Sequence, residues 1–194
     1  MPSTLNAVAV FCGSRFGKNP LYKQAAQTVG QTLAQAGIRL VYGGGAHGLM
    51  GVVADATLCA GGAVTGVIPD FLESREKMHE GVAELIVTDS MHTRKQIMFS
   101  RADAFWILPG GFGTFDEMME ILTWKQLGRH SKPIILINTA NWADMLLAAL
   151  DAAVEQGFAS AEARAMIEAV PDVETALARS LCAEQSDRVA VDQL

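Results

Sequence analysis

A glycine-rich segment that ends in acidic residues, Pro109–Glu117, is the part of this 194-residue chain best suited to chemistry. It lies between an apolar run, Ala104–Leu108, and a helix expected from Phe115 to about Leu127. A strand, a glycine-rich turn and a helix start together place backbone amide groups around an anion. Closely spaced glycines also let the backbone adopt positive φ or touch a ligand. The segment therefore predicts an anion site.

The same residues also have a purely structural interpretation. Thr114 and Glu117 have the spacing of a capping box, which satisfies free amide groups at a helix start. Asp116, Glu117 and Glu120 would then crowd three carboxylates into the first turn, whereas a capping box needs one. The helix dipole stabilises each acid there by only about 0.3–1 kcal/mol. A phosphorylated sugar would use both features, with its phosphate on the amide groups and a hydroxyl or an attacking water on a carboxylate.

Two further loops follow predicted strands. Ser14 and Arg15 come after the first strand and either reach a ligand or form a plain turn. The segment 43–51 follows the second strand, and Gly43, Gly45 and Gly48 match the dinucleotide pattern GxGxxG. An oxidoreductase that used this pattern would need a further substrate domain, for which little chain is left. We interpret the segment as a second amide cradle that helps to hold one mononucleotide.

An arginine borders the apolar face of the helix expected over 91–102. Met91 and Met98 recur at helical spacing, and Arg94 lies within one turn of each. Because an unpaired buried charge is unfavourable, we expect Arg94 to be paired or functional. The alternative is an arginine whose charged end reaches water from the edge of the core. Lys95 is its neighbour.

The elements that position these residues alternate between strand and helix. This order predicts an α/β fold, a single-domain Rossmann-like parallel sheet with helices on both faces, in which ligands bind beyond the carboxyl ends of the strands. We expect one domain over residues 1–183 and a polar tail without fixed structure over 184–194. Strands are expected at 7–11, 38–42, 63–68, 84–87, 104–108 and 134–138. Helices are expected at 20–36, from the end of the segment 43–51 to about residue 59, and at 91–102, 115–127, 142–156, 162–169 and 173–181.

The composition excludes several classes of function. A net charge of −6 argues against a nucleic-acid-binding surface. Three widely spaced cysteines without a CxxC pair indicate reduced thiols in a cytoplasmic protein, and the four histidines lack metal-ligand spacing. We find neither a signal peptide nor an apolar run of about 20 residues, so we expect no membrane span.

These motifs resemble the LONELY GUY family of cytokinin riboside 5′-monophosphate phosphoribohydrolases, whose members are often labelled lysine decarboxylases. The family pattern PGGxGTxxE matches Pro109–Glu117, and Met-His-x-Arg-Lys matches Met91–Lys95. The similarity extends to about Phe158 and includes the segments 12–14, 42–51, 67–69 and 123–128.

The resemblance implies hydrolysis of the N-glycosidic bond of a nucleoside 5′-monophosphate, with an N6-modified or a plain adenine as the released base. It implies a homodimer with sites near the subunit interface, and the reaction needs neither a cofactor nor a metal. Catalysis would rest on Glu117, which stabilises positive charge on the sugar or orients water, and on Arg94, which offsets charge on the departing base or holds Glu117. The expected substrate contacts are Glu76, Arg94, Lys95, Gly111, Phe112, Gly113, Thr114, Phe115, Asp116, Glu117 and Thr123, together with Ser14, Gly44 and Gly45.

Other classes of protein give different expectations for the same residues. A non-catalytic nucleotide or molybdopterin carrier of similar fold would bind ligand without needing Glu117. A lysine decarboxylase would need a pyridoxal phosphate site with a Schiff-base lysine, and Lys95 is the only lysine in the motifs. No cofactor motif accompanies Lys95, so we do not favour the decarboxylase.

Overall fold

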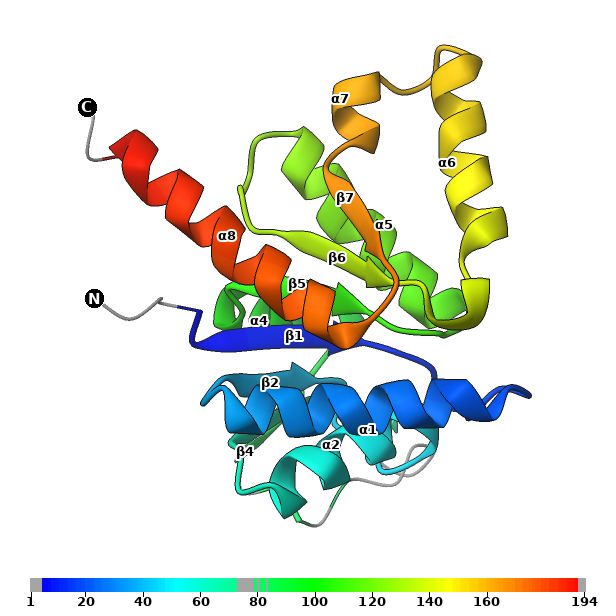
Figure 1. The fold of residues 1–194 in the computed structure, drawn as a ribbon. Coiled ribbons are helices and arrows are strands. Elements are labelled where there is room, and N and C mark those ends of the chain that lie inside the picture. Colours follow the sequence, from blue (N-terminus) through cyan, green and yellow to red (C-terminus); the bar gives the residue numbers. More distant parts are fainter. Residues whose placement is uncertain (1–4, 73–78, 80, 83, 192–194) are drawn as a thin grey trace.

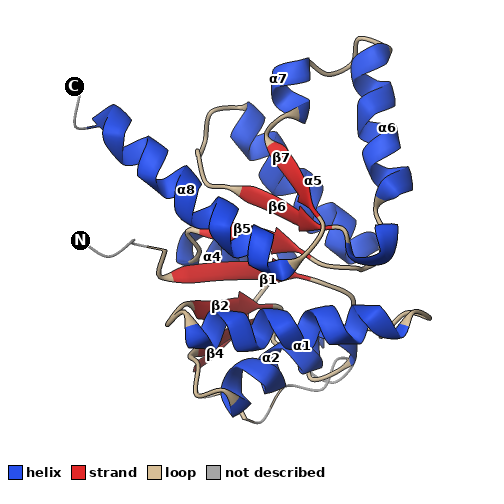
Figure 2. Ribbon diagram, in the orientation of Figure 1, coloured by secondary structure: helices blue, strands red, loops and turns tan. Residues whose placement is uncertain are grey.

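The computed structural model describes residues 5–72, 79, 81–82 and 84–191, which form a parallel sheet with helices on both faces (Figures 1 and 2). Within these residues the sheet has 7 strands in the order β4-β3-β2-β1-β5-β6-β7, and each neighbouring pair is parallel. The predicted fold class is therefore confirmed. The strands are β1 (Ala7–Phe11), β2 (Arg39–Tyr42), β3 (Val64–Pro69), β4 (Glu84–Thr88), β5 (Ala104–Ile107), β6 (Ile134–Ile137) and β7 (Ile167–Val170).

Two apolar layers cover the sheet because strand residues alternate between its faces. In β1, Val8 and Val10 pack in the layer beneath α1, α2 and α8, whereas Ala9 and Phe11 pack in the layer beneath α4 and α5. Burial on both faces explains why β1 is a continuous apolar run. The helices are α1 (Pro20–Gln35), α2 (Gly48–Cys59), α4 (Met91–Arg101), α5 (Phe112–Gln126), α6 (Asp144–Glu155), α7 (Ala161–Arg164) and α8 (Val173–Val191), with short 3-10 turns η1 (Asp70–Leu72) and η2 (Thr139–Asn141).

Helix α5 begins at Phe112, three residues earlier than predicted, with Gly111 as its N-cap in an extended conformation. Thr114 and Glu117 consequently do not form a capping box, and the first turn of α5 contains no acidic residue. The capping interpretation and the crowding of carboxylates into the first turn were both wrong. The helix begins directly after Gly110 and Gly111, and Gly111 forms its N-cap without a side-chain hydrogen bond.

The C-terminal region also differs from the prediction. The helix expected over 162–169 is the single turn α7 followed by β7, which pairs with β6 from Ile134↔Ile167 to Ile137↔Val170. Strand β7 buries its two end residues and exposes Glu168 and Ala169, so it lacks the alternation that identifies a strand. Helix α8 continues to Val191 instead of ending near Leu181.

The chain order of the sheet reverses at β1, which lies between β2 and β5. The loops that follow β1 and β5 therefore flank the crevice in which open α/β sheets bind ligands. Backbone hydrogen bonds join these loops: Gly13 N–H donates to the Pro109 carbonyl at 3.0 Å, and Leu49 N–H donates to the Gly13 carbonyl at 3.0 Å. In the described part of the chain, no helix is long and apolar enough to cross a membrane.

Candidate active site

A buried ion pair joins helices α4 and α5 at this edge of the sheet. Nη1 of Arg94 lies 2.9 Å from Oε1 of Glu117, and the residues are only 6% and 7% exposed. The Nε–H of Arg94 donates to the carbonyl of Val67 at 3.0 Å, so the guanidinium is also fixed to β3. The prediction that Arg94 is paired is confirmed.

The start of α4 explains the orientation of Arg94. Ser90 caps the helix by accepting from the Thr93 N–H at 3.1 Å, which sets where the helix begins. Arg94 and Met98, four residues apart, then lie on the same side of the helix, and both are buried. The sulfur of Met91 lies 4.0 Å from Nη1 of Arg94.

The start of α5 supplies the predicted amide cradle. The first amide group of the helix with an acceptor one turn back is that of Phe115, which donates to the Gly111 carbonyl at 3.0 Å. The amide groups from Phe112 to Thr114 precede it and have no acceptor within the helix. Gly111, Phe112 and Gly113 are exposed, Phe112 to 91%, so the amide groups of Phe112 and Gly113 lie at a surface that a ligand can reach.

Thr114 and Phe115 connect the cradle to the rest of the protein. Thr114 is buried, and a Cβ atom added to Gly110 would meet its hydroxyl, so Gly110 leaves the space that this side chain fills. The ring of Phe115 stacks on that of Trp142, with 6.1 Å between ring centroids. Both contacts fix the first turn of α5 relative to the ends of β5 and β6.

The second glycine-rich segment is tied to neighbouring parts of the protein. Two amide groups in the first turn of α2 have partners within the protein, because Leu49 N–H donates to Gly13 and Gly51 N–H donates to His47 at 3.2 Å. Gly44 is buried with φ +78°, and a Cβ atom there would lie 3.0 Å from Cβ of Ile68. The segment therefore joins loops together, and it offers fewer free amide groups than α5.

Ser14 and Gly45, which were expected to contact substrate, differ in their exposure to solvent. Ser14 is exposed, and its backbone lies where a side chain at Gly48 would be, so the loop after β1 packs closely on the start of α2. Gly45 is buried. Of these two residues, Ser14 has the access that contact with a ligand requires.

Lys95 lies between two carboxylates of α5. Its Nζ is 3.1 Å from Asp116 and 3.0 Å from Glu120. Burial opposes the charge of the ammonium, but the hydrogen bonds to Glu120 and Asp116 outweigh it and raise the pKa of Lys95. The contact of Lys95 with this pair was not predicted, although the spacing of four residues places Asp116 and Glu120 on one side of a helix.

One of the predicted contacts, Thr123, is not at the Arg94–Glu117 pair. Thr123 is exposed on α5, and its hydroxyl donates to the Met119 carbonyl at 2.8 Å. The spacing of six residues turns Thr123 to a different side of the helix from Glu117. Glu76 lies outside the described residues.

Two buried polar groups at the ends of β1 and β2 were not predicted. Burial, and then the charge of Glu117, raise the pKa of the Cys12 thiol, which is therefore protonated at the end of β1. The hydroxyl of Tyr42 is buried without a hydrogen-bond partner among the described residues, and burial raises its pKa as well. Neither side chain was assigned a role from the sequence, because each residue ends an apolar run predicted to be a strand.

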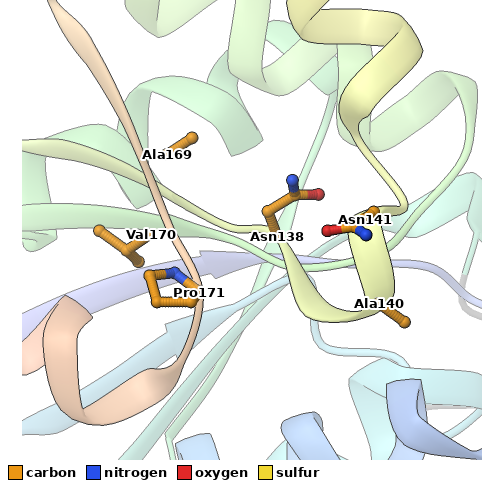
Figure 3. Close-up of a pocket in the computed structure, with 6 residues that line it drawn as sticks. All are labelled: Asn138, Ala140, Asn141, Ala169, Val170 and Pro171. Atoms are coloured by element: carbon orange, nitrogen blue, oxygen red, sulfur yellow. The ribbon is translucent and has the colours of Figure 1, made fainter.

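A separate pocket of about 390 Å³ lies at the ends of β6 and β7 (Figure 3). Asn138 and Asn141 line one side of it and Val170 and Pro171 the other (Figure 3). The carboxamide of Asn138 is already bonded to the start of α6, with Nδ2 donating to Asp144 at 2.7 Å and Oδ1 accepting from the Ala143 N–H at 2.9 Å. The described residues include no cluster of three or more His, Cys, Asp or Glu side chains that could hold a metal ion.

The fold and the site together define a Rossmann-like α/β protein with an amide cradle beside a buried carboxylate. The chain belongs to the LONELY GUY family of cytokinin riboside 5′-monophosphate phosphoribohydrolases, and the family description "Possible lysine decarboxylase" matches residues 50–180. The resemblance stated from the motifs is thereby confirmed.

Relatives from a plant and a bacterium are similar over most of the chain. The cytokinin riboside 5′-monophosphate phosphoribohydrolase LOG2 of Arabidopsis thaliana is 44% identical over 170 residues, which cover 88% of this chain and 80% of the relative. The enzyme of that name from Rhodococcoides fascians is 43% identical over 176 residues, covering 90% and 89%.

Solved structures also share the fold. The molybdenum cofactor carrier protein of Chlamydomonas reinhardtii superimposes with a TM-score of 0.68 at 24% identity, covering 90% of this chain and 94% of that protein. At this level of identity, the likeness concerns the fold alone.

Proposed function

We propose that this protein hydrolyses the N-glycosidic bond of cytokinin riboside 5′-monophosphates and releases the free base and ribose 5-phosphate. The observation that carries the proposal is Glu117, a buried carboxylate held by Arg94 beside the amide cradle of α5. Hydrolysis of a cytokinin riboside 5′-monophosphate requires both a phosphate site and a group that acts at the sugar. The two lie on one helix here.

The chemistry assigns Glu117 to the reacting sugar. Breaking an N-glycosidic bond develops positive charge on the ribose, which a carboxylate stabilises, and a water molecule must be oriented for attack. In a site with little water, a fixed charge acts more strongly than it does in solvent. Glu117 serves both needs if the sugar lies over the start of α5.

Arg94 has the role of a positioning residue. Its Nε–H donates to the Val67 carbonyl and its Nη1 contacts Glu117, so two of its three nitrogens are held by protein oxygens. Of the two roles expected for Arg94, this geometry supports holding Glu117 over neutralising the departing base. A planar guanidinium with several fixed donors is well suited to orienting a carboxylate.

The phosphate would bind at the amide groups from Phe112 to Thr114, where the helix dipole of α5 also favours an anion. Ser14, on the loop hydrogen-bonded to Pro109, would add a hydroxyl donor beside this cradle. Asp116 and Glu120 both contact Lys95, whose ammonium offsets one of their two negative charges beside the phosphate.

The alternatives are less well supported. A non-catalytic molybdopterin or nucleotide carrier would need the cradle, but it would not need a buried carboxylate with its own arginine. A Schiff-base lysine needs its amine deprotonated, whereas the neighbours of Lys95 raise the pKa of that amine. This contradicts the decarboxylase description for this site.

We also propose a cytoplasmic homodimer that uses the exposed side of α5. Phe112, Met119 and Leu127 are large apolar residues that recur on this side of the helix and remain exposed in a single chain. Thr123 lies on the same side, next to Met119. A second copy covering this surface would bury the apolar side chains and bring Thr123 close to a subunit interface.

Product analysis tests the proposed activity. The protein and its Glu117→Ala variant are each incubated with isopentenyladenosine monophosphate, with AMP and with the corresponding nucleosides. We expect free base from the nucleotides with the parent only, and much slower release from nucleosides that lack the phosphate. Tight binding of both nucleotides without any base release would favour the carrier instead.

A further inference from the structure

Gly43, the residue that follows β2, leaves the space in which the guanidinium group of Arg94 lies. A Cβ atom built on Gly43 would meet Nη2 of Arg94, and it would lie 3.0 Å from Sδ of Met50. Gly43 does not have a positive φ, so its backbone conformation does not require glycine. The space that a side chain would occupy at position 43 is filled by the guanidinium.

Three elements therefore fix this planar group. Gly43 at the end of β2 lies against Nη2, the Val67 carbonyl of β3 accepts from Nε at 3.0 Å, and Glu117 of α5 contacts Nη1 at 2.9 Å. The dinucleotide-like pattern of the sequence suggested a ligand-facing role for Gly43. Its environment in the structure is instead the side chain of Arg94.

We propose that Gly43 is a positioning residue: its missing side chain lets Arg94 lie against the end of β2 and thereby hold Glu117 in place. The catalytic consequence rests on the proposed function, but the packing relationship does not. In this arrangement β2 contributes to the site without touching substrate.

The Gly43→Ala variant should fold, because the atom that the new methyl group meets is the far end of a flexible side chain. Moving that end has a specific consequence. The guanidinium is held at Nε and Nη1, so a shift at Nη2 disturbs its contacts with Val67 and Glu117. The backbone around position 43 need not move.

Kinetics separate positioning from binding. We expect Gly43→Ala to lower kcat for the nucleotide about 100-fold, as a misplacement of about 1 Å in a catalytic group does, with KM little changed. KM is retained because the amide groups of α5 still hold the phosphate. Unchanged kcat in a folded Gly43→Ala variant would overturn the proposal.

Gly62→Ala is a matched control for the packing effect. A Cβ atom there would lie 2.7 Å from Cβ of Ala34 and 2.7 Å from Cγ2 of Thr57, far along the chain from Arg94 and Glu117. This variant should lower the Tm and leave both kcat and KM at parental values. A parallel loss of kcat in Gly62→Ala would attribute the effect of Gly43→Ala to general destabilisation.

A double-mutant cycle measured by thermal unfolding tests the packing of Arg94 against Gly43 independently of activity. In the parent, Gly43→Ala should lower the Tm, and in an Arg94→Gln background the drop should be less than half as large, since only Met50 still opposes the methyl group. Equal drops in both backgrounds would overturn the proposal. If the parent hydrolyses no nucleotide, the proposed function fails, while the cycle still decides whether Arg94 occupies the space at Gly43.

Discussion

Arg94 and Glu117 form an ion pair at 2.9 Å in which both side chains are almost completely removed from solvent. A pair of this kind stabilises the fold little in comparison with apolar residues of the same shape, yet it is very sensitive to the loss of one partner. Each side chain alone would be a buried charge without compensation. A single substitution at either position is therefore expected to lower stability, whatever it does to activity.

We predict that Glu117→Ala and Arg94→Met each lower the free energy of unfolding by about 3–5 kcal/mol. The double variant should be more stable than the sum of the two losses predicts, because it leaves no unpaired charge. Urea denaturation measures all three. Arg101→Met, which removes an exposed pair with Glu84, is the control and should cost at most about 1 kcal/mol. Strictly additive losses would contradict the coupling.

We predict that a charge on the exposed side of α5 separates the proposed dimer. Met119→Lys and Leu127→Glu should each convert the protein to monomers, because a lone charge in a covered apolar surface is not tolerated. Light scattering after size-exclusion chromatography gives the mass directly. Phe71→Ser, at an exposed residue of η1, should leave the mass unchanged. A dimer that survives both α5 variants would place the interface elsewhere.

His130 gives the fold a dependence on pH. Its Nε2–H donates to the Ile121 carbonyl at 2.8 Å, and its ring lies edge-on to Phe99 and Phe105. Burial, and less strongly the charges of Lys125 and Lys132, lower the pKa of His130 below its usual 6.5, although the Ile121 carbonyl opposes this. His130 is thus neutral in the folded protein around neutral pH.

We predict that acid destabilises the protein partly through this residue. As the pH falls below 6.5, His130 gains a proton in the unfolded chain before it does so in the folded one, so stability declines until the pH reaches the lower folded value. His130→Gln keeps a donor for Ile121 and should flatten the decline of the urea midpoint over this interval. His92→Gln, at an exposed turn of α4, should not change it. An identical decline in the parent and in His130→Gln would exclude His130 as the source.

The parts of the fold that could be predicted were those marked by residues with a specific local role, such as a helix cap or a positive φ. Asn19 accepts from the Leu21 N–H at 3.0 Å before Pro20 opens α1, and Gly37 follows its end with φ +70°, so α1 matches the helix predicted over 20–36 to within one residue. Strand β7 could not be predicted in this way. It is defined by pairing with β6, and its own four residues carry no strand pattern.

The sequence indicated which residues to consider for the candidate site, but it did not predict most of the contacts between them. The burial of Arg94 followed from its place on α4, but its partner depends on how α4 and α5 pack across the sheet, which no local pattern encodes. The carboxylate cluster was placed in the wrong turn, because the glycines hid the true start of α5. Gly43 matched a familiar ligand motif, and its contact with a side chain could be seen only in three dimensions.

The hydrogen bonds among the loops at Gly13, Leu49 and Pro109 have a consequence for folding order. They join segments that are distant along the chain, just as β1 pairs with β5 from Val8↔Ala104 onward. Contacts that close such long loops are entropically slow to form. An emerging N-terminal half can assemble β1, β2 and β3, but the nascent chain cannot build its catalytic centre until β5 has been synthesised and has docked beside β1.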